Sequence, residues 1–504
     1  MKWMPILFLL IVAASLGLRI PNLAARPMHH DEANQAYRFG TLLEEGTYAY
    51  DADDHHGPTL YYLTLPIAWL TGAESFAETT ETTYRILPVI FGMLLILCTP
   101  LLRSGIGCIA VLVASLLTAI SPAMAYYSRF YIQEILLVFF TLLTIAAGWL
   151  SLKSGSRGWA AVCGLSAGLM FATKETAVIS YAAMFGSGLL CTRFARKPHL
   201  PLKNLLIAGA CAIAVAVVLF SSFLTHPGGP LESILAFKGY FARSSGVDTN
   251  HVHPWYFYLR MLIWYRFEGG PVWSESLIFF LGLGGCLLIL LKKVPANCNL
   301  GLARFLMFYT LLLTLAYSAI AYKTPWCILS FLHGWILLAG ISVATGFESA
   351  RRSKILSVLI LVLLLAASTK MGKRALLAVD RYAADYRNPY VYAHTSPDFK
   401  NLLKRIGELE AISPKGREMH IQVISAPDAT WPLPFYLRGF PNVGYWVDTA
   451  AVPSTPKPDI IVSAADFETT PDEFLTEFYG LRPDTLLAIH IDSNLWNIFI
   501  EMRK

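Results

Sequence analysis

Two adjacent carboxylates and two histidines follow the first apolar segment of this 504-residue chain, in the sequence Met28-His29-His30-Asp31-Glu32. Charged groups beside an apolar slab are costly unless they are paired or used. One interpretation makes Asp31 or Glu32 a general base that takes a proton from an attacking hydroxyl or amine. The other makes the pair a helix N-terminus, where the macrodipole favours acids. The sequence leaves both interpretations open.

A second polar cluster lies further along the same loop. Histidine and carboxylate side chains suit zinc or manganese, but their spacing here matches no closed metal motif. A solvated turn before the next helix, signalled by Gly57-Pro58, is the simpler interpretation. The cluster comprises Asp51, Asp53, Asp54, His55 and His56.

A third polar group enters a later apolar segment, in Tyr126-Tyr127-Ser128-Arg129-Phe130-Tyr131-Ile132-Gln133-Glu134. An acid such as Glu134 at the edge of a membrane span should face a cavity or a partner rather than lipid. Arg129 would either pair with Glu134 and fix helix packing, or bind an anionic group. We favour a functional role, because the first loop is expected at the same rim.

Two lone lysines are expected at the outer membrane edge, against the usual bias of basic residues toward the inside. They are Lys174, in Thr173-Lys174-Glu175, and Lys323, in Tyr322-Lys323-Thr324-Pro325-Trp326. Each could snorkel to the lipid headgroups or serve as a point charge for a phosphate. Lys323 is the stronger candidate, since Pro325 and Trp326 would fix its loop.

A further long loop contains polar and aromatic residues that could form a mobile lid or an interfacial helix. The sequence favours neither. These residues are Asp248, Thr249, Asn250, His251, His253, Trp255, Arg260 and Arg266.

The composition is that of a membrane protein. Hydrophobic residues make up 55% of the chain and charged residues only 15%, whereas soluble domains carry about 25% charged residues. No long basic run with interleaved aromatics occurs, which excludes a nucleic-acid partner. All eight cysteines lie between residues 98 and 327, so no disulfide framework holds the large polar regions.

Eleven segments have the length and apolar composition of a spanning helix. The first also has features of a cleaved signal peptide, but retaining it gives the more consistent orientation. The segments lie near 4–20, 84–102, 105–123, 132–151, 158–174, 176–192, 203–224, 274–291, 304–322, 326–346 and 354–370.

Loop charges predict that the N-terminus is inside and the C-terminus outside. With this orientation every inside loop is basic and almost free of acids, whereas the first outside loop is rich in acids, as the positive-inside rule requires. The basic inside residues are Arg103, Lys153, Arg157, Arg193, Arg196, Lys197, Lys203, Lys292, Lys293, Arg304, Arg351, Arg352 and Lys354.

These patterns predict an α-helical polytopic membrane domain over 1–370 and a small outside α/β domain over 371–504. The outer loops 21–83 and 225–273 are rich in aromatics, which favour the membrane interface. In the second domain we expect a helix over 397–410 and short strands. The expected strands are His420–Ser425, Asp459–Ser463, Leu486–Ile491 and Leu495–Glu501, the last two joined by a turn at Asp492-Ser493-Asn494.

Together these motifs resemble the GT-C glycosyltransferases, which include protein O-mannosyltransferases, oligosaccharyltransferases and the aminoarabinose transferase of lipid A. Those proteins have an acidic motif in the first outer loop, similar to His30-Asp31-Glu32, and a second motif similar to Ser128-Arg129-Phe130 through Glu134. More narrowly, the chain is similar to a prokaryotic family labelled flippase-activity-associated. That similarity rests on His30-Asp31-Glu32-Ala33, His56-Gly57-Pro58, Ser128-Arg129-Phe130 with Gln133-Glu134, Ala172-Thr173-Lys174-Glu175-Thr176, Tyr322-Lys323-Thr324-Pro325-Trp326 and Trp431-Pro432-Leu433-Pro434-Phe435-Tyr436-Leu437-Arg438.

The resemblance implies sugar transfer from a polyprenyl-phosphate donor to a glycan, lipid or protein acceptor. The reaction would invert the anomeric carbon on the outer face of the inner or plasma membrane, with the C-terminal domain in the periplasm or exterior. Asp31 would be the base, and Glu32 and Glu134 would orient the acceptor or a metal. The substrate-binding residues would be Arg129, Lys174 and Lys323, which hold the phosphate, together with His30, His56 and His253.

The resemblance fixes no cofactor, because some relatives use a divalent metal ion and others do not. An Mg²⁺, Mn²⁺ or Zn²⁺ ion would have Asp31, Glu134 and His29 as candidate ligands.

Two alternatives keep the fold without the chemistry. One is a non-catalytic transporter or flippase-associated component for lipid-linked glycans. Transporters often contain two similar halves with interrupted helices, and the sequence shows no such repeat. The other is a structural subunit of an assembly. Unchanged glycan production after Asp31→Asn would favour these alternatives over a transferase.

Overall fold

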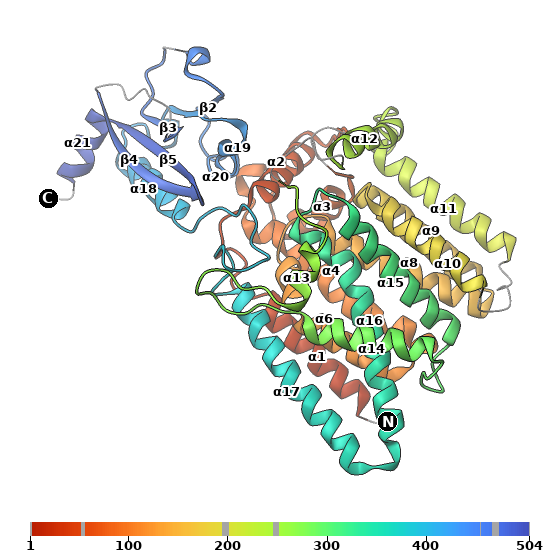
Figure 1. Ribbon diagram of the computed structural model, residues 1–504. Coiled ribbons are helices and arrows are strands. Elements are labelled where there is room, and N and C mark those ends of the chain that lie inside the picture. Colours follow the sequence, from red (N-terminus) through yellow and green to blue (C-terminus); the bar gives the residue numbers. More distant parts are fainter. Residues whose placement is uncertain are drawn as a thin grey trace.

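The computed structural model describes residues 3–51, 56–193, 201–244, 251–453, 455–465 and 473–502. A large helical bundle carries a smaller α/β domain at one end, and the N-terminal helix starts at the opposite end (Figure 1). The predicted helical membrane fold with a small C-terminal α/β domain is confirmed. We call the end of the bundle that faces this domain the loop end.

A helix occurs at each of the eleven predicted spans. Six helical stretches in the described chain are long and apolar enough to cross a membrane, and four others are shorter but apolar. The count of eleven spans and their orientation stay predictions. The helices are α1 (Met4–Arg19), α4 (Glu81–Cys98), α6 (Cys108–Ile120), α8 (Glu134–Ser154), α9 (Arg157–Thr173), α10 (Ala177–Thr192), α11 (Leu202–Phe220), α14 (Ser276–Leu290), α15 (Leu300–Ala319), α16 (Leu329–Ser349) and α17 (Lys354–Val379).

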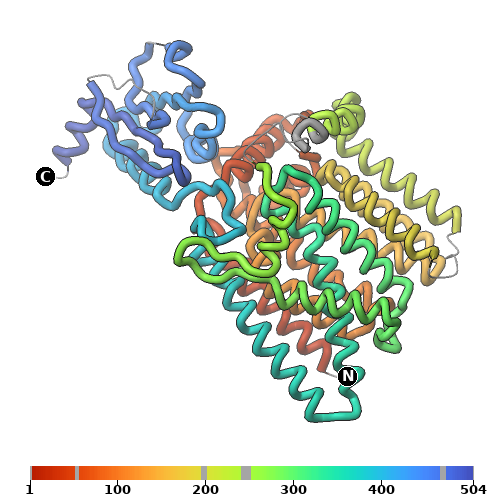
Figure 2. Tube along the Cα trace, viewed as in Figure 1, coloured from red at the N-terminus to blue at the C-terminus, as the bar shows by residue number. Residues whose placement is uncertain are grey.

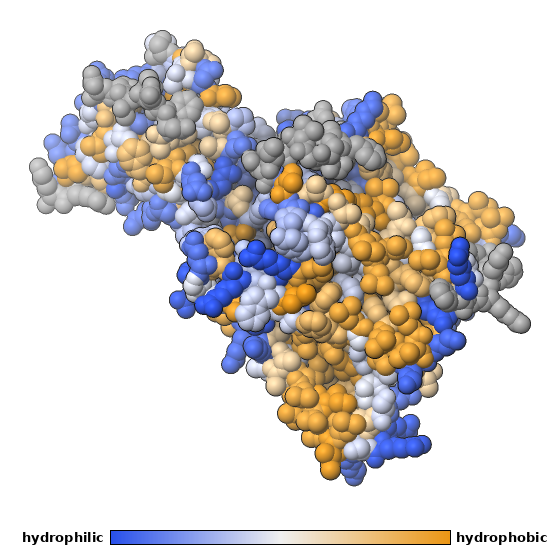
Figure 3. Space-filling view, viewed as in Figure 1, coloured by the Kyte–Doolittle hydropathy of each residue, from blue (hydrophilic) through white to orange (hydrophobic). Residues whose placement is uncertain are grey.

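The middle of the bundle is formed by α8 and α16, which are largely buried, whereas α11 and α17 are almost entirely exposed. Apolar side chains cover the flank of the bundle (Figure 3), as expected for a surface in contact with lipid. Helix α11 packs on α9 through Gly164 and Gly168, where a Cβ atom would collide with the α11 backbone. Small residues thus allow the close helix approach that is typical of membrane bundles.

Shorter helices form the connections of the bundle. Helices α2, α3 and α12 gather at the loop end (Figures 1 and 2). The connecting helices are α2 (His30–Glu45), α3 (Thr59–Thr71), α5 (Arg103–Ile106), α7 (Pro122–Tyr127), α12 (Gly229–Ser244) and α13 (Phe257–Ile263), with the 3₁₀ turns η1 (Phe76–Glu78), η2 (Thr99–Leu102), η3 (Pro325–Ile328) and η4 (Ala350–Arg352).

The C-terminal domain contains one five-stranded sheet in the order β2-β1-β3-β5-β4. Strand β1 is parallel to β2 and β3, whereas β5 is antiparallel to β3 and β4. Helices α18 and α21 cover the sheet through buried Leu and Phe side chains. The elements are β1 (Ile421–Ile424), β2 (Val443–Trp446), β3 (Ile460–Ala464), β4 (Phe474–Arg482), β5 (Thr485–Asp492), α18 (Phe399–Ile412), α19 (Pro427–Thr430), α20 (Leu433–Tyr436), α21 (Ser493–Glu501), η5 (Gly416–Glu418) and η6 (Thr449–Ala451).

The predicted strand Leu495–Glu501 is wrong, because this segment is helix α21. Asp492 does not begin a hairpin turn; its side chain accepts a hydrogen bond from the Asn494 amide and caps the helix. The buried residues Leu495 and Phe499 are four apart, which is a helical spacing.

The segment between the two domains packs back onto the bundle. Helix α17 runs to Val379, beyond the predicted end at 370. The Tyr390 carbonyl then accepts a hydrogen bond from the Tyr127 hydroxyl at 2.9 Å, and the Thr395 hydroxyl donates one to the Met28 carbonyl at 2.7 Å. This segment therefore reaches the first loop, where the acidic motif lies.

Candidate active site at the loop end

Glu32 is a buried anchor. Its carboxylate accepts two hydrogen bonds from Arg26, at 2.8 and 3.0 Å, and two from Arg85, at 2.9 and 2.7 Å. The backbone amides of His29 and Tyr131 each donate another at 3.0 Å. Burial alone would raise the pKa of Glu32, but the two arginines outweigh it and hold the pKa well below its usual range. Glu32 is thus saturated with donors.

Asp31, the next carboxylate, is in a different environment. Its side chain is 38% exposed, and its Oδ2 lies 3.9 Å from Nδ1 of His29. No arginine or lysine of the described chain forms an ion pair with it. Of the two adjacent carboxylates, only Asp31 has oxygens available to a substrate.

His29 joins the acidic motif to the interdomain segment. Its Nδ1 accepts a hydrogen bond from the Asp31 amide at 3.0 Å, so Nε2 carries the proton and donates to the Tyr392 carbonyl at 2.9 Å. Burial lowers the pKa of His29 and keeps the ring neutral. Its ring lies against those of Phe130 and His394, with centroids 5.2 and 4.7 Å away.

Tyr392 connects this motif to the predicted phosphate ligand Lys323. Its hydroxyl lies 2.6 Å from His251 Nδ1 and 3.4 Å from His253 Nε2. The His253 carbonyl in turn accepts a hydrogen bond from Lys323 Nζ at 3.1 Å. Asp31 and Lys323, 292 positions apart, thus belong to one network through His29 and Tyr392. We call Asp31, His29, Tyr392, His251, His253 and Lys323 the loop-end network.

Lys323 is buried, and its ammonium donates to the carbonyls of His253 and Ile320. Among the described residues it forms no ion pair with a carboxylate. Burial lowers the pKa of Lys323, and the pKa of His253 is lowered by burial and by the charges of His251 and Lys323. An anion bound here would relieve that electrostatic cost.

Glu134 pairs with Lys174 rather than with Arg129. The Lys174 Nζ lies 2.5 Å from Glu134 Oε1, and both side chains are buried. The pair lies within electrostatic range of Cys327 in η3, the turn that follows Lys323. The pairing of Arg129 with Glu134, considered as one alternative from the sequence, does not occur.

The two histidines predicted to bind substrate in the first loop, His30 and His56, have separate surroundings. His30 lies beside Trp431, with ring centroids 6.0 Å apart. His56 Nδ1 lies 3.2 Å from Oε2 of the buried Glu175, whose other oxygen accepts a hydrogen bond from the Tyr50 hydroxyl at 2.6 Å. Of the other members of the second polar cluster, Asp51 is exposed, and Asp53, Asp54 and His55 lie outside the described residues.

The predicted metal ligands Asp31, Glu134 and His29 do not form a site. Both ring nitrogens of His29 are engaged, and Glu134 is held by Lys174. Within the described ranges, no group of three or more His, Cys, Asp or Glu residues is arranged to hold a metal ion. The donor set present does not fit a divalent ion.

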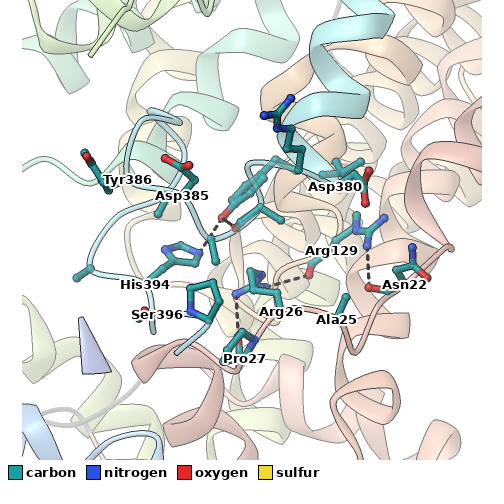
Figure 4. A pocket seen from close by; sticks show the side chains of 18 of the residues that line it. Asn22, Ala25, Arg26, Pro27, Arg129, Asp380, Asp385, Tyr386, His394 and Ser396 are labelled. Carbon is teal, nitrogen blue, oxygen red and sulfur yellow. Dashed lines mark hydrogen bonds between the residues drawn. The ribbon is translucent and has the colours of Figure 1, made fainter. Parts of the chain in front are cut away.

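Arg129 lines a cavity of about 570 Å³ beside the interdomain segment (Figure 4), and neither Lys174 nor Lys323 is among the residues that line it. Its guanidinium donates to the carbonyls of Leu18 at 3.1 Å and Asn22 at 3.2 Å. Neither Asp31 nor Lys323 lines this cavity.

Comparison with known proteins identifies the fold. Aminoarabinose transferase ArnT from Cupriavidus metallidurans, solved with undecaprenyl phosphate, superimposes with a TM-score of 0.60 at 15% identity over 97% of this chain and 98% of its own. The chain has the GT-C fold. The resemblance to the GT-C proteins, inferred from the sequence motifs, is confirmed for the fold. Membership of the narrower flippase-activity-associated family stays a prediction.

Other comparisons agree with the GT-C fold. The oligosaccharyltransferase of Archaeoglobus fulgidus matches with a TM-score of 0.58 at 14% identity over 88% of this chain, and this chain spans 64% of its length. A second structure of it, with Zn and sulfate, has a TM-score of 0.55 at 14% identity, covering 91% and 68% of the two chains. Residues 56–225 match the family described as dolichyl-phosphate-mannose-protein mannosyltransferase. No curated protein matches the chain significantly by sequence.

Three important residues were not predicted from the sequence. Arg26 and Arg85 hold Glu32, and Tyr392 connects the loop-end network. Arg26 breaks the expected charge bias of an outside loop, and Arg85 is a charged residue at the start of a predicted span; these signals could have identified them. Tyr392 has no local signal, because its role depends on the return of the interdomain segment to the bundle.

Proposed function

We propose that this multi-pass membrane protein transfers a sugar from a polyprenyl-phosphate donor to an acceptor at the loop end, with Asp31 as the general base. One observation carries the proposal: Asp31, which holds the available carboxylate of the acidic motif, and Lys323, a buried lysine without a carboxylate partner in the described chain, belong to one hydrogen-bond network, which Asp31 joins through its backbone amide. The GT-C fold supports the assignment by analogy.

The reaction follows from the positions of these groups. Asp31 takes the proton from the acceptor hydroxyl or amine as that atom attacks the anomeric carbon. The bond from this carbon to the phosphate oxygen breaks, and its electrons leave with the polyprenyl phosphate. Lys323 stabilises the charge on that phosphate. Because one direct displacement occurs, the anomeric configuration inverts.

Other predicted site residues receive supporting roles. His253 flanks Lys323 and would bind the phosphate with it. Glu134 and Lys174 neutralise each other, so we assign them to positioning η3 rather than to proton transfer. Glu32 likewise positions the start of α2. His30 and His56 would contact the acceptor side of the site.

The side of the membrane is also part of the proposal. The loop charges support a position of the loop end and the C-terminal domain on the periplasmic or exterior side of the cell membrane. A lipid-linked donor would enter from the outer leaflet, and the acceptor, which is a glycan, lipid or protein, from the aqueous phase.

Asp31→Asn tests the proposal in full-length protein reconstituted with its native lipid-linked sugars. We expect transfer to fall by about 10²-fold or more, the usual contribution of a general base, with unchanged thermal stability. Glu45→Gln changes an exposed acid at the far end of the same helix and should keep full activity. If Asp31→Asn produced the same glycans as the wild type, the protein would instead be a transport component of lipid-linked sugar assembly.

A further inference from the structure

Four arginines and two carboxylates are among the residues that line the cavity beside the interdomain segment, and most of the other lining residues are apolar. Its walls are the first loop, the start of the segment after α17, and the turn between β4 and β5 (Figure 4). The charged residues on these walls are Arg26, Arg129, Arg381, Arg482, Asp380 and Asp385.

Internal ion pairs account for only part of this charge. Arg26 is paired with Glu32, and Asp385 with Arg387, whose Nη2 lies 2.6 Å from Oδ2. The remaining lining groups are three arginines and one carboxylate, Asp380. The ion pair does not cancel the charge of Arg26 fully, because Arg26 shares Glu32 with Arg85. The cavity has a surplus of positive charge.

Arg129 is held in place at the cavity wall. Two of its N–H groups are fixed by the carbonyls of Leu18 and Asn22, and no carboxylate of the described chain lies within ion-pair distance. Burial and the charges of Arg26 and Arg85 lower the pKa of Arg129 to about 10, although Asp380 acts in the opposite direction. Its charge is therefore destabilised, and a bound anion would stabilise it.

The arginines come from separate parts of the chain. Arg381 follows the C-terminal end of α17, where this exposed helix leaves the bundle. Arg482 belongs to the C-terminal domain, and its guanidinium donates to the Asp428 carbonyl. A ligand that contacts both would bridge the bundle and the C-terminal domain.

We propose that this cavity is a second anion site, which binds a phosphate group between Arg129, Arg381 and Arg482. Arginine suits phosphate because its planar guanidinium donates two parallel hydrogen bonds to phosphate oxygens. The phosphate belongs either to an anionic phospholipid headgroup next to α17 or to a soluble phosphate compound. The site is separate from the loop-end network and does not depend on the proposed transfer reaction.

Binding measurements on the full-length protein distinguish the two sources. Inorganic phosphate is titrated by calorimetry into protein in phosphatidylcholine nanodiscs, and native mass spectrometry measures phosphatidylglycerol retained from mixed nanodiscs. Arg381→Gln should weaken binding by about tenfold or more, the effect expected from a hydrogen bond to a charged group. If phosphatidylglycerol in the nanodisc abolishes the binding of inorganic phosphate, the lipid is the ligand. If phosphate still binds in its presence, the ligand is a soluble compound.

Two further variants, Arg129→Lys and Arg417→Gln, show whether a loss of binding comes from the site or from misfolding. Arg381 is exposed and makes no hydrogen bond within the described residues, so its replacement should not disturb the fold. Arg129→Lys keeps the positive charge but removes the planar guanidinium that donates two parallel hydrogen bonds. Arg417→Gln, which removes an exposed arginine of the C-terminal domain, should bind as the wild type does. The proposal is overturned if the wild type binds neither probe, or if Arg381→Gln and Arg129→Lys bind both probes like the wild type.

Discussion

Replacing Glu32 by glutamine tests whether the two adjacent carboxylates have separate roles. Each oxygen of Glu32 accepts three hydrogen bonds: Oε1 from Arg26, Arg85 and Tyr131, and Oε2 from Arg26, Arg85 and His29. A glutamine keeps one acceptor oxygen, but its amide group then faces three donors. Three hydrogen bonds are lost, and two of them come from buried guanidinium groups.

The structure sets the size of this effect. Two hydrogen bonds from charged donors contribute about 1.5–3 kcal/mol each, so Glu32→Gln should destabilise the fold by roughly 3–6 kcal/mol. That range agrees with the ~3–5 kcal/mol cost of removing one partner from a buried ion pair. Asp31→Asn breaks no ion pair with an arginine or lysine and should leave stability within about 0.5 kcal/mol.

The assay compares thermal unfolding and sugar transfer for both variants in the same nanodiscs, with Glu45→Gln as the control. Glu32→Gln should unfold at a much lower temperature, while Asp31→Asn should unfold like the wild type and be inactive. The opposite pattern, a stable but inactive Glu32→Gln and an active Asp31→Asn, would refute the assignment of Asp31 as base.

Three further predictions concern single contacts. Lys323→Met removes the buried cation of the loop-end network, and kcat/KM for the lipid donor should fall by about tenfold or more; unchanged kinetics would exclude a phosphate at Lys323. Glu134→Gln and Lys174→Met should each lower the free energy of unfolding by about 3 kcal/mol, and the double variant should lower it by less than the sum of the two. If the two losses were additive in thermal unfolding, the residues would not be a coupled pair. Burial lowers the pKa of His29 and His394 in the folded protein. As the pH falls below 6.5, their usual pKa, the unfolded chain binds more protons than the folded chain, so the free energy of unfolding decreases. Above that pH the two histidines cause no such loss. His394→Gln should flatten this pH dependence of the unfolding temperature, and an unchanged profile would assign it to other groups.

The helical part of the fold was predictable because apolar length is a strong local signal. A helix occurs at all eleven expected segments, since a chain in lipid must satisfy its backbone hydrogen bonds within each segment. The C-terminal domain was harder. The edge strand β2 (Val443–Trp446) is only partly buried and lacks a continuous apolar run, and the final segment Leu495–Glu501 is short enough to suit a strand or a helix.

The candidate site was predictable as a set of residues but not as a set of contacts. Asp31 and Lys323 belong to the same network, as expected from the sequence, which predicts both on the same side of the membrane. The partners of Arg129, by contrast, were unpredictable, because its guanidinium binds the carbonyls of Leu18 and Asn22 rather than a side chain. Backbone carbonyls have no sequence signature, so tertiary packing alone decides such contacts.

The different roles of Asp31 and Glu32 follow from helix geometry. Successive residues of an α-helix are rotated by about 100°, so two adjacent acids at the start of α2 cannot both face the core. The buried stripe of this helix includes Gln35, Ala36 and Phe39, which lie three, four and seven positions after Glu32. That spacing places Glu32 on the buried face, where it requires the two arginines as partners. Asp31 is then directed away from the core, and an adjacent pair of acids provides one buried anchor and one partly exposed carboxylate, which we propose as the base.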